Sequence, residues 1–381
     1  MPDHLKKSTV LTAAAVLGLI GIRAMRHRDE GDLRSQVVLI TGGSRGLGFL
    51  LAREFAREGC RVVICARDER ELEQAQADLE AEGADVLTFV GNVGNRDDVR
   101  RMIDDVLRIY GRLDVLVNNA GVIQVGPIQS LRIGDFEEAM DVMYWGVLYP
   151  TLAALPHMLE RRHGRIVNVT SIGGKVAIPH LSPYTSAKFA AVGFSEGLRA
   201  ELAGTGVTVT TIVPGLMRNG SYQNAFFKGR QESEYTWFSL GASLPLISMN
   251  AERAARQIVQ ASKRGEAERT LSLPAVLLAR CHGLFPGLTA DLLGLAARFL
   301  LPDPAGDGFA AARGMEVQSQ LRPPRRQILN SLTTLGRRAA HRYNQYPGPI
   351  TALAEERQTA IQEDTENYGL YSRESKTDQF R

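Results

Sequence analysis

Tyr184 and Lys188, four residues apart in the segment SPYTSAKFAAVGF, have side chains that together could carry out acid–base chemistry. If the segment is helical, this spacing places both on one face. A free phenol has a pKa of about 10, and the positive charge of a neighbouring lysine favours the phenolate and lowers that pKa. Ser171 precedes Tyr184 by thirteen residues, in VNVTSIGG. Because a Y-x-x-x-K pair alone is common by chance, its meaning depends on the elements around it.

A glycine-rich segment, TGGSRGLGFL at residues 41–50, follows the apolar run VVLI and opens a helical pattern. Gly42, Gly46 and Gly48 allow the backbone to turn tightly and to approach a ligand closely. The amides at the N-terminus of a helix bind phosphate groups. The segment therefore predicts a phosphate-binding loop, although glycines also mark ordinary turns.

Apolar strands alternate with helical stretches from residue 36 onward. Strands that are apolar throughout are typical of a parallel sheet covered by helices on both faces. With right-handed crossovers, the order predicts an α/β fold with a doubly wound sheet, which binds ligands at the carboxyl ends of its strands. The expected strands are 36–41, 61–66, 86–93, 113–121, 164–171 and 207–215, and the expected helices include 47–58, 96–110, 135–161 and 183–204.

Together these segments resemble the short-chain dehydrogenase/reductase family, with its Rossmann-like fold, over residues 36–270. The motifs that match are T-G-x-x-x-G-x-G, GNV at 91–93 (usually Asp-Val), NNAG, the Ser-Tyr-Lys set and PG. The resemblance implies hydride transfer between a nicotinamide cofactor and a carbonyl, with Tyr184 as acid and base, Lys188 on the cofactor ribose and Ser171 on the carbonyl. It implies cofactor contacts from Thr41, Gly42, Ser44, Arg45, Gly46, Leu47, Gly48, Arg67, Asn92, Val93, Asn119, Ala120, Gly121, Tyr184, Lys188, Pro214 and Gly215.

The end of the second expected strand favours NADP(H) over NAD(H). In this kind of fold the adenosine ribose meets that end, and a carboxylate there hydrogen-bonds the free 2′-hydroxyl of NAD. Ala66 stands at this place, Arg67 follows it, and Arg45 lies in the glycine loop. Two guanidinium groups and no acid suit a phosphate monoester, and Asp68 comes one residue too late. The alternative is that Arg67 only begins a solvated helix.

One position departs from the family pattern. Family members commonly have an asparagine three residues before a glycine in the long helix, where it supports a proton-relaying water; here Met143 precedes Gly146. A thioether cannot hydrogen-bond water comparably, although a backbone carbonyl can take over this part. The alternative to an enzyme is therefore a cofactor-sensing or scaffold protein that has kept the fold.

Three regions bear on the substrate and on partners. Aromatic residues after 216 predict either a lid over a lipophilic carbonyl or alcohol, or the ordinary core of an enlarged lid. Residues 271–302 are apolar but broken by proline and glycine, which predicts two short helices that pack on the domain or dip into a membrane surface. In 325–342, one helical face carries Ile328, Leu329, Leu332 and Leu335, which fits a lipid-surface or a docking helix. The aromatic residues are Tyr222, Phe226, Phe227, Tyr235, Trp237 and Phe238.

The segment 8–22 has no charge, with lysines before it and arginines after it. A helix of this length spans roughly 22 Å, less than the roughly 30 Å of a bilayer core, but flanking cations extend its reach. We expect a membrane anchor with the catalytic domain facing the cytoplasm, which the downstream arginines favour. A helix along the protein's own surface and a cleaved signal are the alternatives.

The composition argues against other partners. A net charge of +3 over 381 residues is too small for a typical nucleic-acid-binding protein, and the seven histidines show no metal-ligand spacing, so we assign no metal. Apolar Ala190, Val192 and Phe194 on the helix 183–204 are compatible with a homo-oligomer. The expected parts are an anchor at 1–30, a catalytic domain at 31–270, an apolar then basic helical extension at 271–345 and a polar, disordered tail at 346–381.

Overall fold

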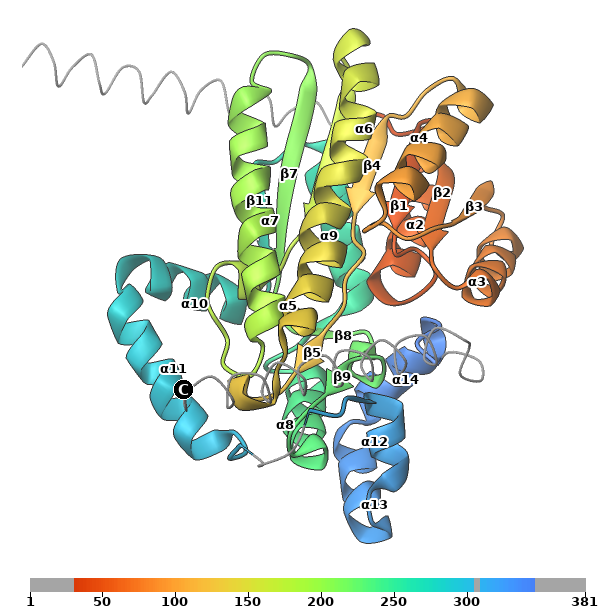
Figure 1. Cartoon of the computed structure of the whole chain (residues 1–381). Helices are drawn as coiled ribbons and strands as arrows, with labels where there is room; N and C mark the ends of the chain where they lie inside the picture. The colour runs from red at the N-terminus through yellow and green to blue at the C-terminus, as the bar shows by residue number, and fades with distance from the viewer. Residues whose placement is uncertain (1–30, 305–308, 347–381) are drawn as a thin grey trace, which may run out of the picture. The chain divides into compact units, whose positions relative to one another are not determined.

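A parallel sheet of seven strands forms the centre of the computed structural model, which describes residues 31–304 and 309–346 (Figure 1). The strand order is β11-β7-β6-β4-β1-β2-β3, and all neighbours are parallel. The chain winds outward from β1 in both directions, which is the doubly wound topology that the sequence predicted. The strands are β1 (Val37–Thr41), β2 (Arg61–Ala66), β3 (Val86–Val90), β4 (Val115–Asn118), β6 (Gly164–Val169), β7 (Val207–Pro214) and β11 (Glu268–Leu271).

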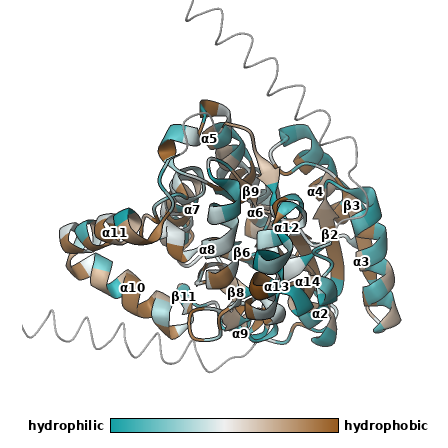
Figure 2. Ribbon diagram, turned by 90° about the horizontal axis from the view of Figure 1, so that it is seen from below, coloured by the Kyte–Doolittle hydropathy of each residue, from teal (hydrophilic) through white to brown (hydrophobic). Residues whose placement is uncertain are grey.

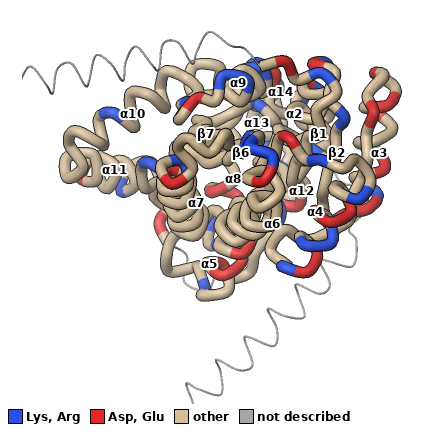
Figure 3. The backbone as a smooth tube through the Cα atoms, turned by 90° about the horizontal axis from the view of Figure 1, so that it is seen from above, with Lys and Arg blue, Asp and Glu red and all other residues tan. Residues whose placement is uncertain are grey.

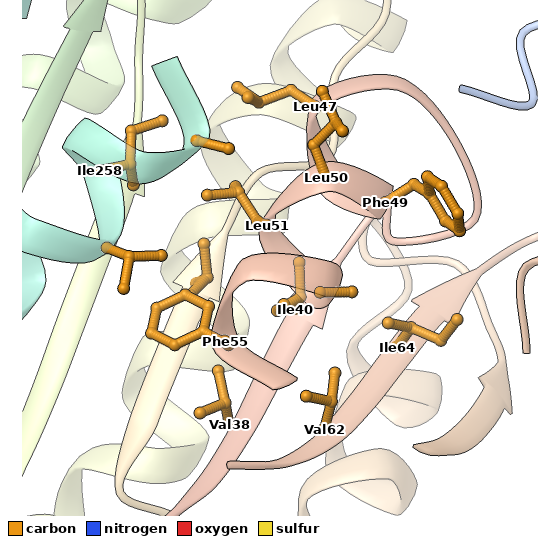
Figure 4. Packing of buried hydrophobic residues seen from close by; sticks show 14 of the residues in the cluster. Val38, Ile40, Leu47, Phe49, Leu50, Leu51, Phe55, Val62, Ile64 and Ile258 are labelled. Carbon is orange, nitrogen blue, oxygen red and sulfur yellow. The ribbon is translucent and has the colours of Figure 1, made fainter. Parts of the chain in front are cut away.

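Helices cover both faces of this sheet because the central strands are apolar on both sides. Val38 and Ile40 of β1 pack into one hydrophobic cluster with α2 and α9 (Figure 4). Val37 and Leu39 pack into a second cluster on the opposite face. The first layer consists of α2 (Gly46–Arg57), α3 (Glu69–Ala81) and α9 (Ala251–Lys263), and the second of α4 (Arg96–Tyr110), α6 (Gly146–Glu160) and α7 (Ser182–Glu201).

Local sequence signals explain several helix ends. The side chain of Asn95 accepts hydrogen bonds from two backbone amides in the first turn of α4, and Gly111 ends this helix in the left-handed conformation. Asp68 caps α3 in the same way, through the amide of Glu71 at 3.0 Å. Asp68 therefore serves as the N-cap of α3, which explains an acid directly after Arg67.

The long helix expected at 135–161 is divided. It consists of α5 (Ile133–Met140), a π-helical turn at Asp141–Trp145, and α6. Gly146 follows the turn and lies against Val93, since a Cβ atom at Gly146 would be 2.7 Å from Val93 Cγ2. The remaining short elements, which periodicity did not predict, are β5 (Gln124–Val125), β8 (Met217–Arg218), β9 (Phe226–Phe227), β10 (Met249–Asn250), β12 (Ala312–Arg313) and 3₁₀ turns at Ile128–Ser130, Ile172–Gly174 and Ser221–Gln223.

The C-terminal extension packs against the lid helix α8 (Gln231–Ser243) and shares its hydrophobic cluster (Figure 1). The single helix expected at 325–342 breaks at Thr333, so its four apolar residues do not form one buried face: Leu329 is buried, while Ile328, Leu332 and Leu335 are exposed. The extension comprises α12 (Gly314–Gln320), α13 (Pro323–Leu332) and α14 (Thr334–Arg342), and the compact unit ends at Gln345.

Residues 271–302 form the two expected helices, α10 (Leu273–Leu284) and α11 (Pro286–Leu300). The interpretation that they pack on the domain is wrong for most of their length, because only Ala275 and Thr289 are buried. Hydrophobic residues run along both helices (Figure 2). Most of both helices carries no charge (Figure 3). The exposed apolar side chains are Leu273, Leu277, Leu284, Phe285, Leu288, Leu292, Leu295, Phe299 and Leu300.

Among the described helices, none has the length and apolar character that crossing a membrane requires. The expected anchor at 8–22 and the expected disordered tail fall in segments 1–30 and 347–381, outside the described residues.

The apolar face expected on α7 is only partly exposed. Val192 is buried within its own chain, where it lies against Gly174. The exposed apolar side chains of α6 and α7 are instead Leu152, Leu159 and Phe189.

Candidate active site

Ser171 and Tyr184 come together at the carboxyl end of the sheet. Ser171 follows β6, and Tyr184 lies in the first turn of α7, where the two side chains are hydrogen-bonded. The Ser171 hydroxyl also accepts a hydrogen bond from the Gly173 amide at 3.0 Å. A Cβ atom at Gly173 would lie 3.1 Å from Tyr184 Cε1 and 3.5 Å from Ser171 Oγ. Glycine at 173 therefore leaves room for the two hydroxyl groups to meet.

Lys188 lies one helical turn after Tyr184 and is 4% exposed. Its Nζ donates to the carbonyl oxygen of Val169 at 3.0 Å and lies 5.9 Å from the centre of the Tyr184 ring. Burial lowers the pKa of Lys188 to about 8. The helix thus places both side chains on one face, with the lysine held by the last residue of β6.

The ionisation of Tyr184 depends on its burial and on its hydrogen bond. Burial raises the pKa of Tyr184 above its ordinary value, and the hydrogen bond from Ser171 only partly offsets this effect. That Lys188 lowers this pKa stays a prediction; in the structure its ammonium group donates to the Val169 carbonyl.

Met143 is fully buried in the π-helical turn, close to Gly121. A buried polar network that the sequence analysis missed lies between the strands that precede Ser171 and Asn119. Asn118 donates to Asn168 at 2.8 Å, Asn168 donates to Ser195 at 3.0 Å, and Ser195 hydrogen-bonds Thr211 at 2.7 Å. The network links β4, β6, α7 and β7, and therefore holds the strand ends that carry Ser171 and the NNAG segment in register.

The glycine loop is fixed to the end of β4. Thr41 Oγ1 accepts hydrogen bonds from the amides of Asn119 and Ala120 at 3.0 and 3.1 Å, and Asn119 Nδ2 donates to the carbonyls of Thr41 and Gly42. Gly42 has a φ of +65°, and a Cβ atom at Gly48 would lie 1.9 Å from the Gly42 oxygen. Both positions therefore require glycine.

The residues present fit a phosphate group at the N-terminus of α2. The first amides of a helix lack intrahelical acceptors, and here Leu47 and Gly48 follow Gly46 at this end. Arg45 precedes the helix without a side-chain cap on these amides. Amides in this arrangement bind the pyrophosphate of a dinucleotide.

An acid that the sequence analysis did not anticipate lies at the adenosine end of the loop. Glu71 of α3 forms an ion pair with Arg45 and accepts a hydrogen bond from the Ser44 hydroxyl at 3.1 Å. Arg67 is exposed. Arg313 of the extension is close enough to feel the charges of both arginines. Burial lowers the pKa of Arg313, and the positive charges of Arg45 and Arg67 lower it further. No acid stands at the end of β2, as the sequence indicated, but Glu71 of α3 occupies one of the two arginines.

The other expected cofactor residues lie after β3 and at the end of β7. Asn92 is exposed, and its Oδ1 accepts from the Gly94 amide at 3.1 Å, while Val93 is buried. Pro214 ends β7 and Gly215 follows it. Asn219, shortly after Gly215, is buried, and its Oδ1 accepts from the Ser221 amide at 3.0 Å.

Most aromatic residues after 216 form the core of the lid and do not line a site. Tyr222, Phe227, Tyr235 and Phe238 are 0–5% exposed and make edge-on ring contacts with one another. For these four of the six aromatic residues, burial therefore favours the alternative of an ordinary lid core over contact with a substrate.

Two buried polar pairs connect α8 and the residues just before it to α5 and to the loop before α7. Lys228 forms a 2.7 Å ion pair with Asp135 of α5, and Glu234 of α8 contacts His180, in the loop before α7, at 2.8 Å. A hollow of about 410 Å³ lies beside this loop. Its lining includes Ile128, His180, Ser182, Arg298, Leu301 and Pro302.

Comparison with known proteins agrees with this geometry. The family model for "short chain dehydrogenase" matches residues 36–228. The chain is 39% identical to a "Dehydrogenase/reductase SDR family protein 7-like" of Anopheles gambiae over 52% of this chain and 64% of that protein. It is 34% identical to "11-beta-hydroxysteroid dehydrogenase A" of Sesamum indicum over 62% and 68%.

Solved structures give the same result. An actinorhodin polyketide ketoreductase with NADPH superposes with a TM-score of 0.55 at 30% identity, over 63% of this chain and 95% of that one. A short-chain dehydrogenase from Streptomyces avermitilis gives a TM-score of 0.60 at 27% identity, over 69% and 97%. The chain belongs to the short-chain dehydrogenase/reductase family.

Proposed function

We propose that the protein is an NADP(H)-dependent oxidoreductase that interconverts a lipophilic carbonyl compound and its alcohol. The observation that carries the proposal is the meeting of Ser171, Tyr184 and Lys188 at the strand ends beside the glycine loop. Family membership supports carbonyl–alcohol chemistry at this place.

The nicotinamide, when bound, supplies or accepts a hydride at the carbonyl carbon. The Ser171 hydroxyl, already directed toward the Tyr184 phenol, binds the carbonyl oxygen and orients it. Tyr184 then donates its phenolic proton to the oxygen as negative charge develops there. Lys188, held near the ring by the Val169 carbonyl, stabilises the resulting phenolate by its positive charge.

The preference for NADP(H) rests on the arginines near the glycine loop. Arg45, Arg67 and Arg313 together present positive charge where the 2′-phosphate of NADP(H) is expected, while Glu71 competes for Arg45. The structural relative solved with NADPH agrees with this assignment.

We expect Arg67→Ala to weaken NADPH binding by about tenfold and to leave NADH binding nearly unchanged, because a charge-assisted contact to phosphate is lost. Calorimetric titration of both cofactors measures this. Arg70→Ala, an exposed arginine one position into α3, serves as the control. Tighter binding of NADH than of NADPH by the unmodified chain would contradict the cofactor assignment and leave the enzyme proposal standing.

A lipophilic substrate and membrane association, with the catalytic domain on the cytoplasmic face, form the second part of the proposal. The relatives named as 11-beta-hydroxysteroid dehydrogenases suggest an apolar substrate. The apolar surface of α10 and α11, next to the hollow at Leu301, supports delivery of such a substrate from a lipid surface (Figure 2).

Cys281 on α10 offers a test, because it is exposed while Cys60 and Cys65 are buried and accept label poorly. Burial raises the pKa of both buried thiols to about 12, which suppresses their reactivity further. We expect a polarity-sensitive fluorophore on Cys281 to shift to shorter wavelength when phosphatidylcholine vesicles are added.

Leu277→Asp in the labelled chain is expected to reduce this shift, whereas Leu152→Asp, on α6, is expected to leave it unchanged. If vesicles do not change the emission of the labelled unmodified protein, α10 does not enter a lipid surface.

The second candidate function is cofactor sensing or scaffolding without efficient turnover. The buried Met143, in place of the family asparagine, favours it, because a thioether gives little support to a proton-relaying water.

A further inference from the structure

Residues 343–345, at the end of the C-terminal extension, lie directly on the glycine loop. The amide of Gly46 donates a 2.7 Å hydrogen bond to the Tyr343 carbonyl. Gln345 is 5% exposed, and a Cβ atom built on Gly46 would lie 2.2 Å from Gln345 Nε2. The extension therefore covers one side of the glycine loop, which we call the wall of the loop.

This wall is fixed to several elements of the domain. The Tyr343 hydroxyl donates to Glu252 of α9 at 3.0 Å, and Asn344 Nδ2 donates to Asp78 of α3 at 3.1 Å. The Gln345 amide donates to the Ala340 carbonyl at 2.9 Å. These hydrogen bonds hold the segment against the glycine loop.

The orientation of the Gln345 side chain is determined by Asn224. Asn224 Nδ2 donates to the Gln345 backbone oxygen at 2.6 Å, which establishes Nδ2 as the nitrogen, and also to Gln345 Oε1 at 2.8 Å. With its oxygen bound in this way, the Gln345 side chain presents its NH₂ group to Gly46.

Asn219 shows the same arrangement from the lid side. The Ser221 amide binds Asn219 Oδ1, and Asn219 Nδ2 lies 3.9 Å from the same Cβ position on Gly46. Two side-chain NH₂ groups, from different parts of the chain, therefore lie on the face of Gly46 where a side chain would otherwise stand.

That face has a defined chemical meaning. In a dinucleotide-binding turn, the glycine that follows the tight turn lacks a side chain so that the pyrophosphate can approach the backbone. N–H donors directed to this face, together with the first amides of α2, suit an anion. We propose that Gln345, supported by Asn219, is a ligand of the cofactor pyrophosphate, so that the C-terminal extension completes the cofactor site. This inference rests on the dinucleotide binding proposed above.

Gln345→Ala in the full chain is the first test, by calorimetric titration with NADPH. We expect the affinity to fall by about tenfold or more, because a hydrogen bond to a charged group is lost. Gln345→Met, which has a similar size but no N–H donor, is expected to give the same loss. Adenosine 2′-monophosphate, which has no pyrophosphate, is expected to bind all three proteins equally.

Gln327→Ala, an exposed glutamine of α13, is the matched control and is expected to bind NADPH like the unmodified chain. Equal NADPH affinity in the Gln345 variants would overturn the inference while leaving the proposed function intact. Tighter binding would also overturn it, since the segment would then obstruct the site. If the unmodified chain binds neither NADPH nor NADH, the proposed function itself fails.

Discussion

Tyr184→Phe is expected to lower kcat by about 10²- to 10⁴-fold while NADPH still binds, since only the proton donor is lost. The phenol is hydrogen-bonded to Ser171 at the strand ends, and its ring packs within the domain, so phenylalanine fits the same space. Steady-state rates, followed by the absorbance of NADPH with a panel of lipophilic ketones, measure the change. Calorimetric titration of the variant separates a loss of chemistry from a loss of binding.

Tyr110→Phe, at the end of α4 and far along the chain from the catalytic residues, is the control and is expected to keep full activity. If Tyr184→Phe keeps most of the turnover, Tyr184 is not the acid. If the unmodified protein binds NADPH but reduces none of the ketones, the sensing or scaffold function suggested by Met143 gains support.

Asp114→Ala is expected to reduce the free energy of unfolding by about 1–3 kcal/mol, because it leaves the buried Val37 amide without an acceptor and two partly exposed arginines without their partner. The carboxylate is fully buried at the start of β4. It accepts hydrogen bonds from the Val37 amide at 2.9 Å, from Arg112 at 2.6 and 2.8 Å and from Arg161 at 3.0 Å. Urea denaturation of both proteins measures the difference, and Asp104→Ala, on the exposed side of α4, serves as the control.

The pH dependence of this effect has a defined sign. Burial raises the pKa of Asp114, but hydrogen bonds from Arg112, Val37 and Arg161 outweigh it and hold the pKa below its ordinary value. Because the pKa is lower in the folded state, the carboxylate stabilises the fold above its unfolded pKa of about 3.9. The stability difference between the two proteins is therefore expected to shrink as the pH falls below that value. A difference that stays constant down to acid unfolding would contradict this account.

The sequence by itself determined the sheet and the grouping of Ser171, Tyr184 and Lys188. Strands that are apolar on both sides require helices on both faces, and right-handed crossovers between them then predict a doubly wound sheet. The same connectivity places residues that follow strands, such as Ser171 and the glycine loop at Gly42, along one edge of the sheet. The four-residue spacing then places Tyr184 and Lys188 on one helical face. These are consequences of local periodicity and chain connection.

Only the tertiary structure decided how distant residues complete the site. Glu71 comes to Arg45 from the next helix, and Gln345 comes to Gly46 from the end of the extension. Neither residue lies in a motif, because hydrogen bonds between distant segments leave no periodic signal in the sequence. The same reason applies to surfaces: whether an apolar stretch is buried depends on what packs against it. Tyr222 and Tyr235 find partners in the lid, whereas the leucines of α10 and α11 remain exposed.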